Sequence, residues 1–168
     1  MKPIHRVAAT ATAMALLLQG CGTTAPPSSG GRSTLTVRSE HSAQLGSDVA
    51  LYAMSMLDQS YRWGGKAAQG GFDCSGLVSH VFREAAGVDL RGNAAAMSRQ
   101  SRPVDLAALQ AGDLLFFNTL GQPSSHVGVY VGQGQFVHAA NERSGVRMDR
   151  LGNRYYAARF EGAKTVLD

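Results

Sequence analysis

The sequence predicts one α+β domain at residues 47–168, with N-terminal helices packed on a central antiparallel sheet of about five to six strands. Two observations lead to this fold class. Apolar residues first recur with the spacing of a helix, and further along the chain they alternate with the period of a β-strand. The chain has 168 residues, which is enough for a single domain with its own core.

Two helices are expected at the start of the domain. Ser47 or Asp48 can cap the first, and the second should begin at about Cys74 and end at Gly87. The apolar positions of the first helix are Ala50, Leu51, Met54 and Leu57. Those of the second helix are Leu77, Val78, Val81, Phe82 and Ala85. Each set recurs with helical spacing, so each helix is expected to turn one apolar side to the core.

Five strands are expected after a polar stretch that contains Pro103. They lie at 113–117, 126–131, 135–139, 146–148 and 155–160. The second strand alternates most cleanly, with Val127, Val129 and Val131 on one face and His126, Gly128 and Tyr130 on the other.

The hairpin between the second and third strands brings two histidines together. If residues 132–134 form a three-residue loop, the opposite pairs are Val131 with Gln135, Val129 with Val137, and Gly128 with His138. His126 and His138 then lie on the same face as diagonal neighbours, roughly 7–8 Å apart at the backbone. Gly128 leaves space between them, so His138 can hold one ring nitrogen of His126.

Cys74 is the candidate nucleophile. It lies in the first turn of the second helix, where free N–H groups and the helix dipole favour a thiolate. Asp73, just before it, can cap that helix, and the N–H groups can also serve an oxyanion. The alternative is that Cys74 is a small buried apolar residue, as free cysteines often are. The apolar stripe begins only at Leu77, however, which favours the nucleophile.

A thiol nucleophile needs a base, and the chain has five histidines. His5 and His41 lie in N-terminal segments outside the predicted domain, and His80 lies off the apolar stripe of the second helix, where we expect it to be solvated. His126 is therefore the expected base, and His138 its orienting partner.

The N-terminus has the features of a secretory signal at residues 1–20. A basic start is followed by an apolar stretch, 7–18, that is too short to span a bilayer. The sequence Leu18-Gln19-Gly20-Cys21 resembles a lipobox, which implies that Cys21 becomes the lipidated first residue; a plain secretory signal is the alternative. Residues 21–46 then form a flexible tether, rich in small and polar residues.

The resemblance to lipoprotein signals also implies a location. Gly22 follows the cysteine where inner-membrane retention signals have aspartate, which resembles outer-membrane sorting toward the periplasm of a Gram-negative bacterium. We expect no disulfide between the two cysteines, because each has a separate role. The net charge is +4, and loss of Lys2 and Arg6 with the signal leaves +2, so nucleic acid is not an expected partner.

Several motifs in fixed order resemble the NlpC family of papain-like cell-wall peptidases. They are Tyr61-Arg62-Trp63-Gly64-Gly65, Phe72-Asp73-Cys74-Ser75-Gly76-Leu77-Val78, Gly112-Asp113-Leu114, Ser125-His126-Val127-Gly128-Val129-Tyr130, His138-Ala139 and the ending Tyr156 with Phe160-Glu161-Gly162-Ala163. The similarity covers roughly residues 47–165. It implies a papain-like α+β domain in which the cysteine helix packs on the sheet.

The resemblance also implies site roles and a substrate. Cys74 would attack the scissile amide, His126 would carry its proton to the leaving amine, and His138 would orient His126. By the same resemblance the oxyanion and substrate contacts are Tyr61, Asp73, Ser75 and Ser125. The expected substrate is a peptidoglycan stem peptide, cut at the D-glutamyl–diaminopimelate bond or at the diaminopimelate–D-alanine cross-link. The segment Arg91-Gly92-Asn93 departs from the Pro-Arg-Thr or Pro-Arg-Ser pattern common in the family.

Three other function classes compete with the peptidase. Zinc binding would use Cys74, His126 and His138, but no metal-ligand spacing such as CxxC or HExxH occurs, so we expect no metal and no cofactor. The others are a thiol acyltransferase on the same scaffold and a non-catalytic wall-binding lipoprotein. The presence of both Cys and His favours the peptidase, which we expect to act as a monomer.

Overall fold

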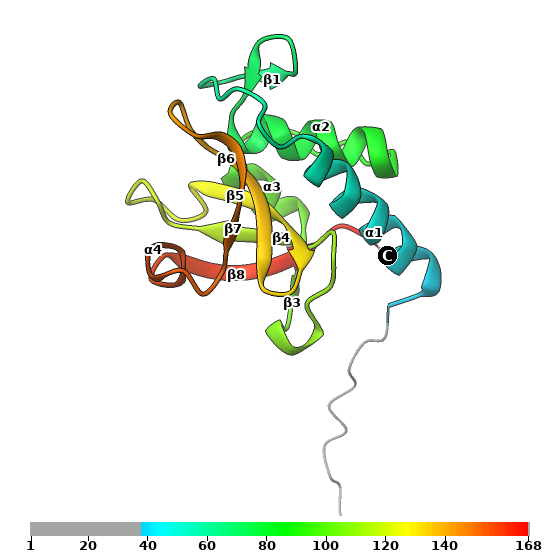
Figure 1. Ribbon diagram of the computed structural model, residues 1–168. Helices are drawn as coiled ribbons and strands as arrows, with labels where there is room; N and C mark the ends of the chain where they lie inside the picture. The colour runs from blue at the N-terminus through cyan, green and yellow to red at the C-terminus, as the bar shows by residue number, and fades with distance from the viewer. Residues whose placement is uncertain (1–37, 168) are drawn as a thin grey trace, which may run out of the picture. The chain divides into compact units, whose positions relative to one another are not determined.

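The computed structural model describes residues 38–167, which form an α+β domain (Figure 1). Its helices are α1 (Glu40–Ser55), α2 (Cys74–Ala86), α3 (Ala94–Gln100) and α4 (Arg154–Ala157), with a short 3-10 turn at Leu106–Ala108. The strands are β1 (Lys66–Ala67), β2 (Gly71–Phe72), β3 (Arg102–Val104), β4 (Leu114–Phe117), β5 (His126–Gly132), β6 (Gln135–Asn141), β7 (Gly145–Arg150) and β8 (Phe160–Thr165). Within this range β3–β8 make a six-stranded antiparallel sheet in the order β3-β8-β4-β5-β6-β7, and β1 pairs with β2 separately.

The sheet is buried on both faces. Helices α1 and α2 pack against each other and against β5, and this side holds the larger core cluster, which includes Val127, Val129 and Val137. The opposite face carries a second cluster of Leu115, Phe117, Phe136, Tyr156 and Ala163. Each fully buried Val, Leu or Phe contributes roughly 1.5–3 kcal/mol of transfer free energy, so the two layers hold β5 and β6 firmly in place.

Helix α2 agrees with the sequence prediction at both ends. It begins at Cys74, Asp73 caps it, and Gly87 ends it with a left-handed φ of 66°. The buried side holds Leu77, Val78, Val81 and Phe82. Gly76 is required in the first turn, because a Cβ there would lie 1.9 Å from the carbonyl oxygen of Gly65.

Helix α1 begins earlier than predicted, so the expected start at Ser47 or Asp48 is wrong. It starts at Glu40, where the hydroxyl of Ser39 accepts the N–H of Ser42 at 3.1 Å. Residues 40–46, which the sequence analysis assigned to the tether, therefore lie in this helix. Leu51, expected in the buried stripe, is 62 % exposed.

Small residues explain why the start of α1 was missed. The buried positions of α1 are Ser42, Gly46, Val49, Ala50 and Ala53. The backbone of α1 packs directly against the backbone near Ala111, so large apolar side chains have no room on this face. A Cβ on Gly46, for example, would lie 2.3 Å from the carbonyl oxygen of Ala111. A search for apolar spacing does not detect such a face.

The strand expected at Tyr155–Phe160 is also wrong. The side chain of Asn153 accepts the N–H of Tyr155 at 2.9 Å and caps α4, so the chain turns through a short helix before β8 begins at Phe160. The other four strands lie close to their predicted positions as β4–β7. Strand β3 and helix α3, in the stretch expected to be polar and irregular, were not predicted.

The β5–β6 hairpin keeps the predicted register by a different route. Val129 pairs with Val137 as expected, but Gly132, not Val131, pairs with Gln135. The loop has two residues, Gln133 and Gly134, with positive φ of 53° and 71°. The register shifts between Tyr130 and Gly132, so Val131 forms a bulge that compensates for the shorter loop.

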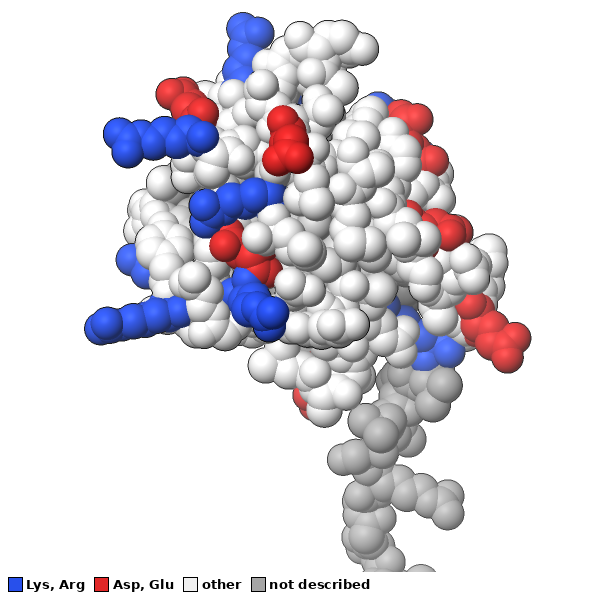
Figure 2. Space-filling model, in the orientation of Figure 1, with Lys and Arg blue, Asp and Glu red and all other residues white. Residues whose placement is uncertain are grey.

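Charged side chains lie toward the edges of the face drawn in Figure 2. Most of the lysine and arginine side chains are on its left, together with a few acidic ones, the right-hand edge is mostly acidic, and a broad uncharged area lies between them. Among residues 38–167, no helix has the length and hydropathy needed to cross a membrane.

Candidate active site

Asp73 holds the turn that presents Cys74. One carboxylate oxygen accepts the N–H of Gly76 at 2.6 Å and the hydroxyl of Ser75 at 2.9 Å. The other accepts the N–H of Gly64 at 3.0 Å. The carboxylate therefore caps α2 and ties the glycine-rich loop to its first turn, as a capping residue at this position should.

Burial keeps the thiol of Cys74 protonated at neutral pH. Burial, with a smaller contribution from the charge of Asp73, raises the pKa of Cys74 to about 11, although backbone N–H groups of Val127, Ser75 and Cys74 itself act in the opposite direction. A base is therefore needed to generate the thiolate.

His126 and His138 form a direct hydrogen bond. The Nε2 atom of His126 lies 2.7 Å from Nδ1 of His138, and the two rings are nearly perpendicular, at 88°. His138 is fully buried and His126 is 8 % exposed. Burial and the neighbouring His138 lower the pKa of His126 to about 3, so its imidazole is neutral at neutral pH.

One cavity of about 310 Å³ collects the predicted site. Its walls include six of the predicted residues, namely Cys74, His126, Tyr61, Asp73, Ser75 and Ser125. His138 lies behind His126 instead of in the cavity wall. The Nδ1 atom of His126 has no hydrogen-bond partner among the described residues, and it is the ring nitrogen that remains for Cys74.

The two serines are engaged in structural hydrogen bonds. The hydroxyl of Ser125 accepts the backbone N–H groups of Thr119 and Leu120 at 2.9 and 3.1 Å, and so fixes the loop before β5. The hydroxyl of Ser75 donates to Asp73. Tyr61 forms an isolated bridge with Phe72 at the cavity wall, and burial, followed by Cys74, raises its pKa.

The segment 91–93, which departs from the family pattern, lies partly outside the cavity and partly in its wall. Arg91 is exposed and pairs with Asp89 at 2.6 Å, outside the cavity wall. Asn93 caps α3 by accepting the N–H of Ala96 at 3.0 Å, and it lines the cavity together with Ala94. His80, expected to be solvated, is half-buried against Phe72 and contacts Tyr52, and burial lowers its pKa.

Three side chains that were not predicted as site residues lie behind His138. The Nε2 atom of His138 lies 2.9 Å from Oδ2 of Asp149, and Arg147 donates from Nε to the same oxygen at 2.7 Å. The hydroxyl of Tyr156 lies 3.3 Å from Nε2 of His138. The available signal was strand alternation, because Arg147 pairs with His138 and Asp149 with Phe136, but the predicted strand stopped at 148.

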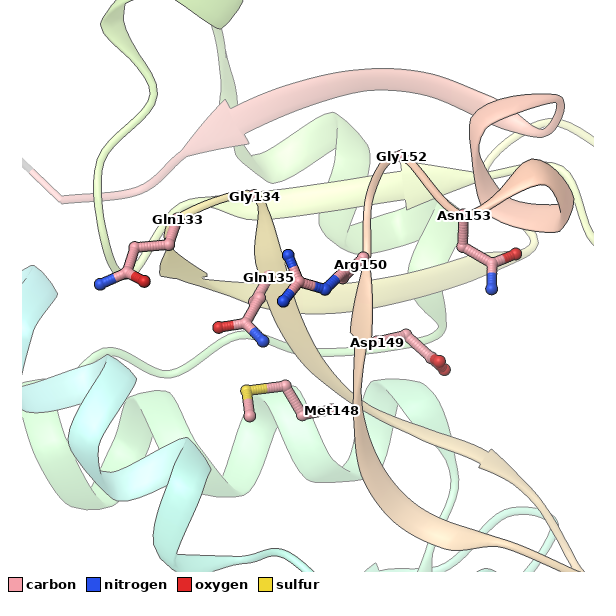
Figure 3. A pocket seen from close by; sticks show the side chains of 8 residues that line it. All are labelled: Gln133, Gly134, Gln135, Met148, Asp149, Arg150, Gly152 and Asn153. Atoms are coloured by element: carbon pink, nitrogen blue, oxygen red, sulfur yellow. The ribbon is translucent and has the colours of Figure 1, made fainter.

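Further hollows lie near the site. One, of about 460 Å³, continues from His126 past Arg147 to Tyr155 and Tyr156. The larger one, about 610 Å³, is open and lies over β6 and β7, where Figure 3 shows Gln135 and Arg150 close together on neighbouring strands and the Asp149 carboxylate pointing away from them. Neither Cys74 nor His126 lines this larger hollow, so we assign the chemistry to the smaller cavity. Within residues 38–167, no group of three or more His, Cys, Asp or Glu side chains is arranged to hold a metal ion.

Comparison with known proteins identifies the family. The model of the NlpC/P60 family matches residues 58–165. The chain belongs to the NlpC/P60 family. The resemblance seen in the motifs and the predicted α+β fold are thereby confirmed.

Two curated relatives come from Escherichia coli K12. Murein DD-endopeptidase MepH is 34 % identical over 117 residues, which cover 68 % of this chain and 43 % of the relative. Murein DD-endopeptidase MepS/Murein LD-carboxypeptidase is 37 % identical over 107 residues, 64 % of this chain and 55 % of the relative. The chain thus spans about half the length of these two relatives.

Solved structures have the same fold. An NlpC/P60 family protein from Bacillus cereus aligns with a TM-score of 0.67 and 30 % identity, covering 73 % of this chain and 40 % of that one. The NlpC/p60 domain of the peptidoglycan hydrolase SagA aligns with a TM-score of 0.62 and 28 % identity over 72 % of this chain and 98 % of that one.

Proposed function

We propose that this protein is a peptidoglycan endopeptidase that hydrolyses amide bonds of stem peptides or their cross-links through a Cys-His-His mechanism. The observation that carries the proposal is the hydrogen-bonded pair of His126 and His138, with His126 lining the same cavity as Cys74, the first residue of α2. The names of the family relatives MepH and MepS, both murein DD-endopeptidases, supply the substrate class.

The mechanism starts from a neutral thiol and a neutral imidazole. The thiol of Cys74 gives its proton to Nδ1 of His126 as sulfur attacks the scissile carbonyl carbon. The oxyanion that forms is stabilised by N–H groups at the start of α2, with the hydroxyl of Tyr61 nearby. His126 then protonates the leaving amine, the C–N bond breaks, and water hydrolyses the thioester to release the acid and restore the thiol.

Two hollows share His126 in their walls, which suits an extended peptide. The first part is also lined by Cys74 and Asp73, and the second by Arg147. In the first part, Asp73, Ser75 and Ser125 are the proposed contacts for the charged groups of the substrate. The names of MepH and MepS favour the diaminopimelate–D-alanine cross-link, and the D-glutamyl–diaminopimelate bond is the alternative.

Digestion of purified peptidoglycan tests the proposal. Wild-type protein is incubated with intact sacculi and with defined stem-peptide fragments, and the products are analysed by mass spectrometry. Conversion of cross-linked dimers to monomers identifies cross-link cleavage, whereas loss of diaminopimelate-containing pieces from monomers identifies the other bond. Identical products from wild type and Cys74→Ala would refute the peptidase. A Cys74→Ala variant that binds sacculi while wild type cuts nothing would support a wall-binding protein instead.

The proposed location depends on residues outside the described range. Cleavage after residue 20 and lipidation of Cys21 would tether the domain to the outer membrane, facing the periplasm, through residues that precede α1. Metabolic labelling with a radioactive fatty acid tests this: wild type should incorporate label and fractionate with outer membranes, and Cys21→Ala should do neither.

A further inference from the structure

We propose that Asp149 is a positioning residue that sets the tautomer of His138 and, through it, the tautomer of the catalytic base His126. The inference rests on the proposed function for its consequence in catalysis, but the tautomers themselves are properties of the folded protein. Asp149 lies on β7, one strand beyond His138 on β6.

Asp149 is held in place by two side chains, His138 and Arg147. It is 16 % exposed, while the His138 side chain that it contacts is completely buried. His138 and Arg147 both lie within hydrogen-bonding distance of Oδ2, at 2.9 and 2.7 Å. Burial alone would raise the pKa of Asp149, but the hydrogen bonds from His138 and Arg147 outweigh it and hold the pKa below its usual value. Asp149 is therefore ionised at neutral pH and can only accept hydrogen bonds.

An acceptor at this position determines both rings in turn. Because Asp149 accepts, Nε2 of His138 must carry the proton. In a neutral imidazole the other nitrogen is then an acceptor, so Nδ1 of His138 accepts from Nε2 of His126 across 2.7 Å. His126 in turn has its lone pair at Nδ1, the nitrogen that must take the proton of Cys74. Two hydrogen bonds in series thus prepare the base in the required tautomer.

Tyr156 is a competing hydrogen-bond partner for Nε2 of His138. Its hydroxyl lies 3.3 Å from Nε2 of His138 and is also within reach of Asp149 and Arg147. With Asp149 removed, this hydroxyl can donate to Nε2 of His138 and move the His138 proton to Nδ1. His126 would then have to accept at Nε2 and carry its own proton on Nδ1, where it blocks transfer from the thiol.

The tautomers can be measured without any catalytic activity. In full-chain Cys74→Ala protein with isotope-labelled histidine, NMR correlation of ring nitrogens with ring protons should place the proton of both His126 and His138 on Nε2. Addition of Asp149→Ala should move both protons to Nδ1, and Asp149→Asn, whose amide oxygen can accept from both neighbours, should leave them on Nε2. A proton on Nδ1 of His138 in the Cys74→Ala protein overturns the inference, even if the Asp149 variants do not fold.

Kinetics separate positioning from general stabilisation. In an active background, Asp149→Ala should lower kcat by about 100-fold, the low end of general acid–base contributions, with KM within about twofold. Asp149→Asn should recover most of that loss. Glu84→Ala is the matched control, because it removes a carboxylate from the exposed pair with Arg83, and it should not change kcat. If wild type cuts no peptidoglycan, the proposed function fails while the tautomer measurement still decides the role of Asp149.

Discussion

The buried ion pair between Arg38 and Asp113 gives a sharp test of the energetics at the start of the domain. Their side chains are 6 % and 0 % exposed, and Asp113 also accepts the N–H of Gln110 at 2.8 Å. Asp113→Asn can keep the bond to Gln110 but leaves the guanidinium buried without a counter-charge. Removal of one partner of a buried pair costs about 3–5 kcal/mol, and we expect about 3 kcal/mol because one bond survives.

The double variant Arg38→Met with Asp113→Asn should recover most of this loss. Burial raises the pKa of Asp113 despite the opposing effects of the Gln110 N–H and Arg38, so desolvation is not fully offset in the native pair. Removing both charges removes that penalty together with the attraction. We therefore expect the double variant to lie within about 1 kcal/mol of wild type.

Urea denaturation, followed by circular dichroism, measures each free energy of unfolding. Glu84→Gln is the control, because the Arg83–Glu84 pair is 56 % and 42 % exposed and should contribute at most about 1 kcal/mol. The reasoning is refuted if Asp113→Asn destabilises no more than Glu84→Gln, or if the double variant is as unstable as Asp113→Asn.

Three further predictions concern the active site. Because burial raises the pKa of Cys74 to about 11, the rate of alkylation by iodoacetamide should rise about tenfold per pH unit from roughly pH 7 to 9; a flat rate would indicate a stable thiolate. Gly128→Ala places a Cβ 2.7 Å from the ring of Phe136 and 3.2 Å from Cβ of His138. We expect the substitution to lower the free energy of unfolding, measured by urea denaturation, by about 1–3 kcal/mol and to lower kcat. Wild-type stability together with wild-type kcat would contradict this packing. Asp73→Ala should lose about 1 kcal/mol of stability as the cap of α2 is removed, whereas Asp73→Asn should lose much less, and equal losses would mean that capping is not the cause.

Features set by local chemistry could be predicted from the sequence. The capping of α2 by Asp73 follows from side-chain chemistry at a single turn, and the alternation in β5 follows from the geometry of one strand. The predicted Val129–Val137 pairing placed His126 and His138 on a common face of the hairpin. The structure confirms their contact, with Nε2 of His126 2.7 Å from Nδ1 of His138.

Features that depend on tertiary packing could not be predicted in the same way. The early part of α1 is stabilised by Ser42 and Gly46 at close backbone contacts, which leave no apolar pattern. Asp149 was not predicted as a site residue, because its contact with His138 requires that β7 pair with β6. Asp149 pairs with Phe136 and reaches His138 diagonally across the two strands. Charged residues in an edge strand such as β7 usually indicate exposure to solvent. Here the neighbouring, buried His138 shows that Asp149 instead has a partner inside the domain.

The bulge at Val131 has a consequence for how this family can vary in length. Deleting Val131 would join Tyr130 directly to Gly132, which already pairs with Gln135, and would leave a regular two-residue hairpin with the same turn. The protein would lose one partly buried side chain of its core and retain both histidines in place. A deletion between His126 and Val129 would instead reverse the faces of the strand and separate the pair. In related sequences, insertions and deletions should therefore occur near Val131, at the end of the hairpin, and should be absent between His126 and Val129.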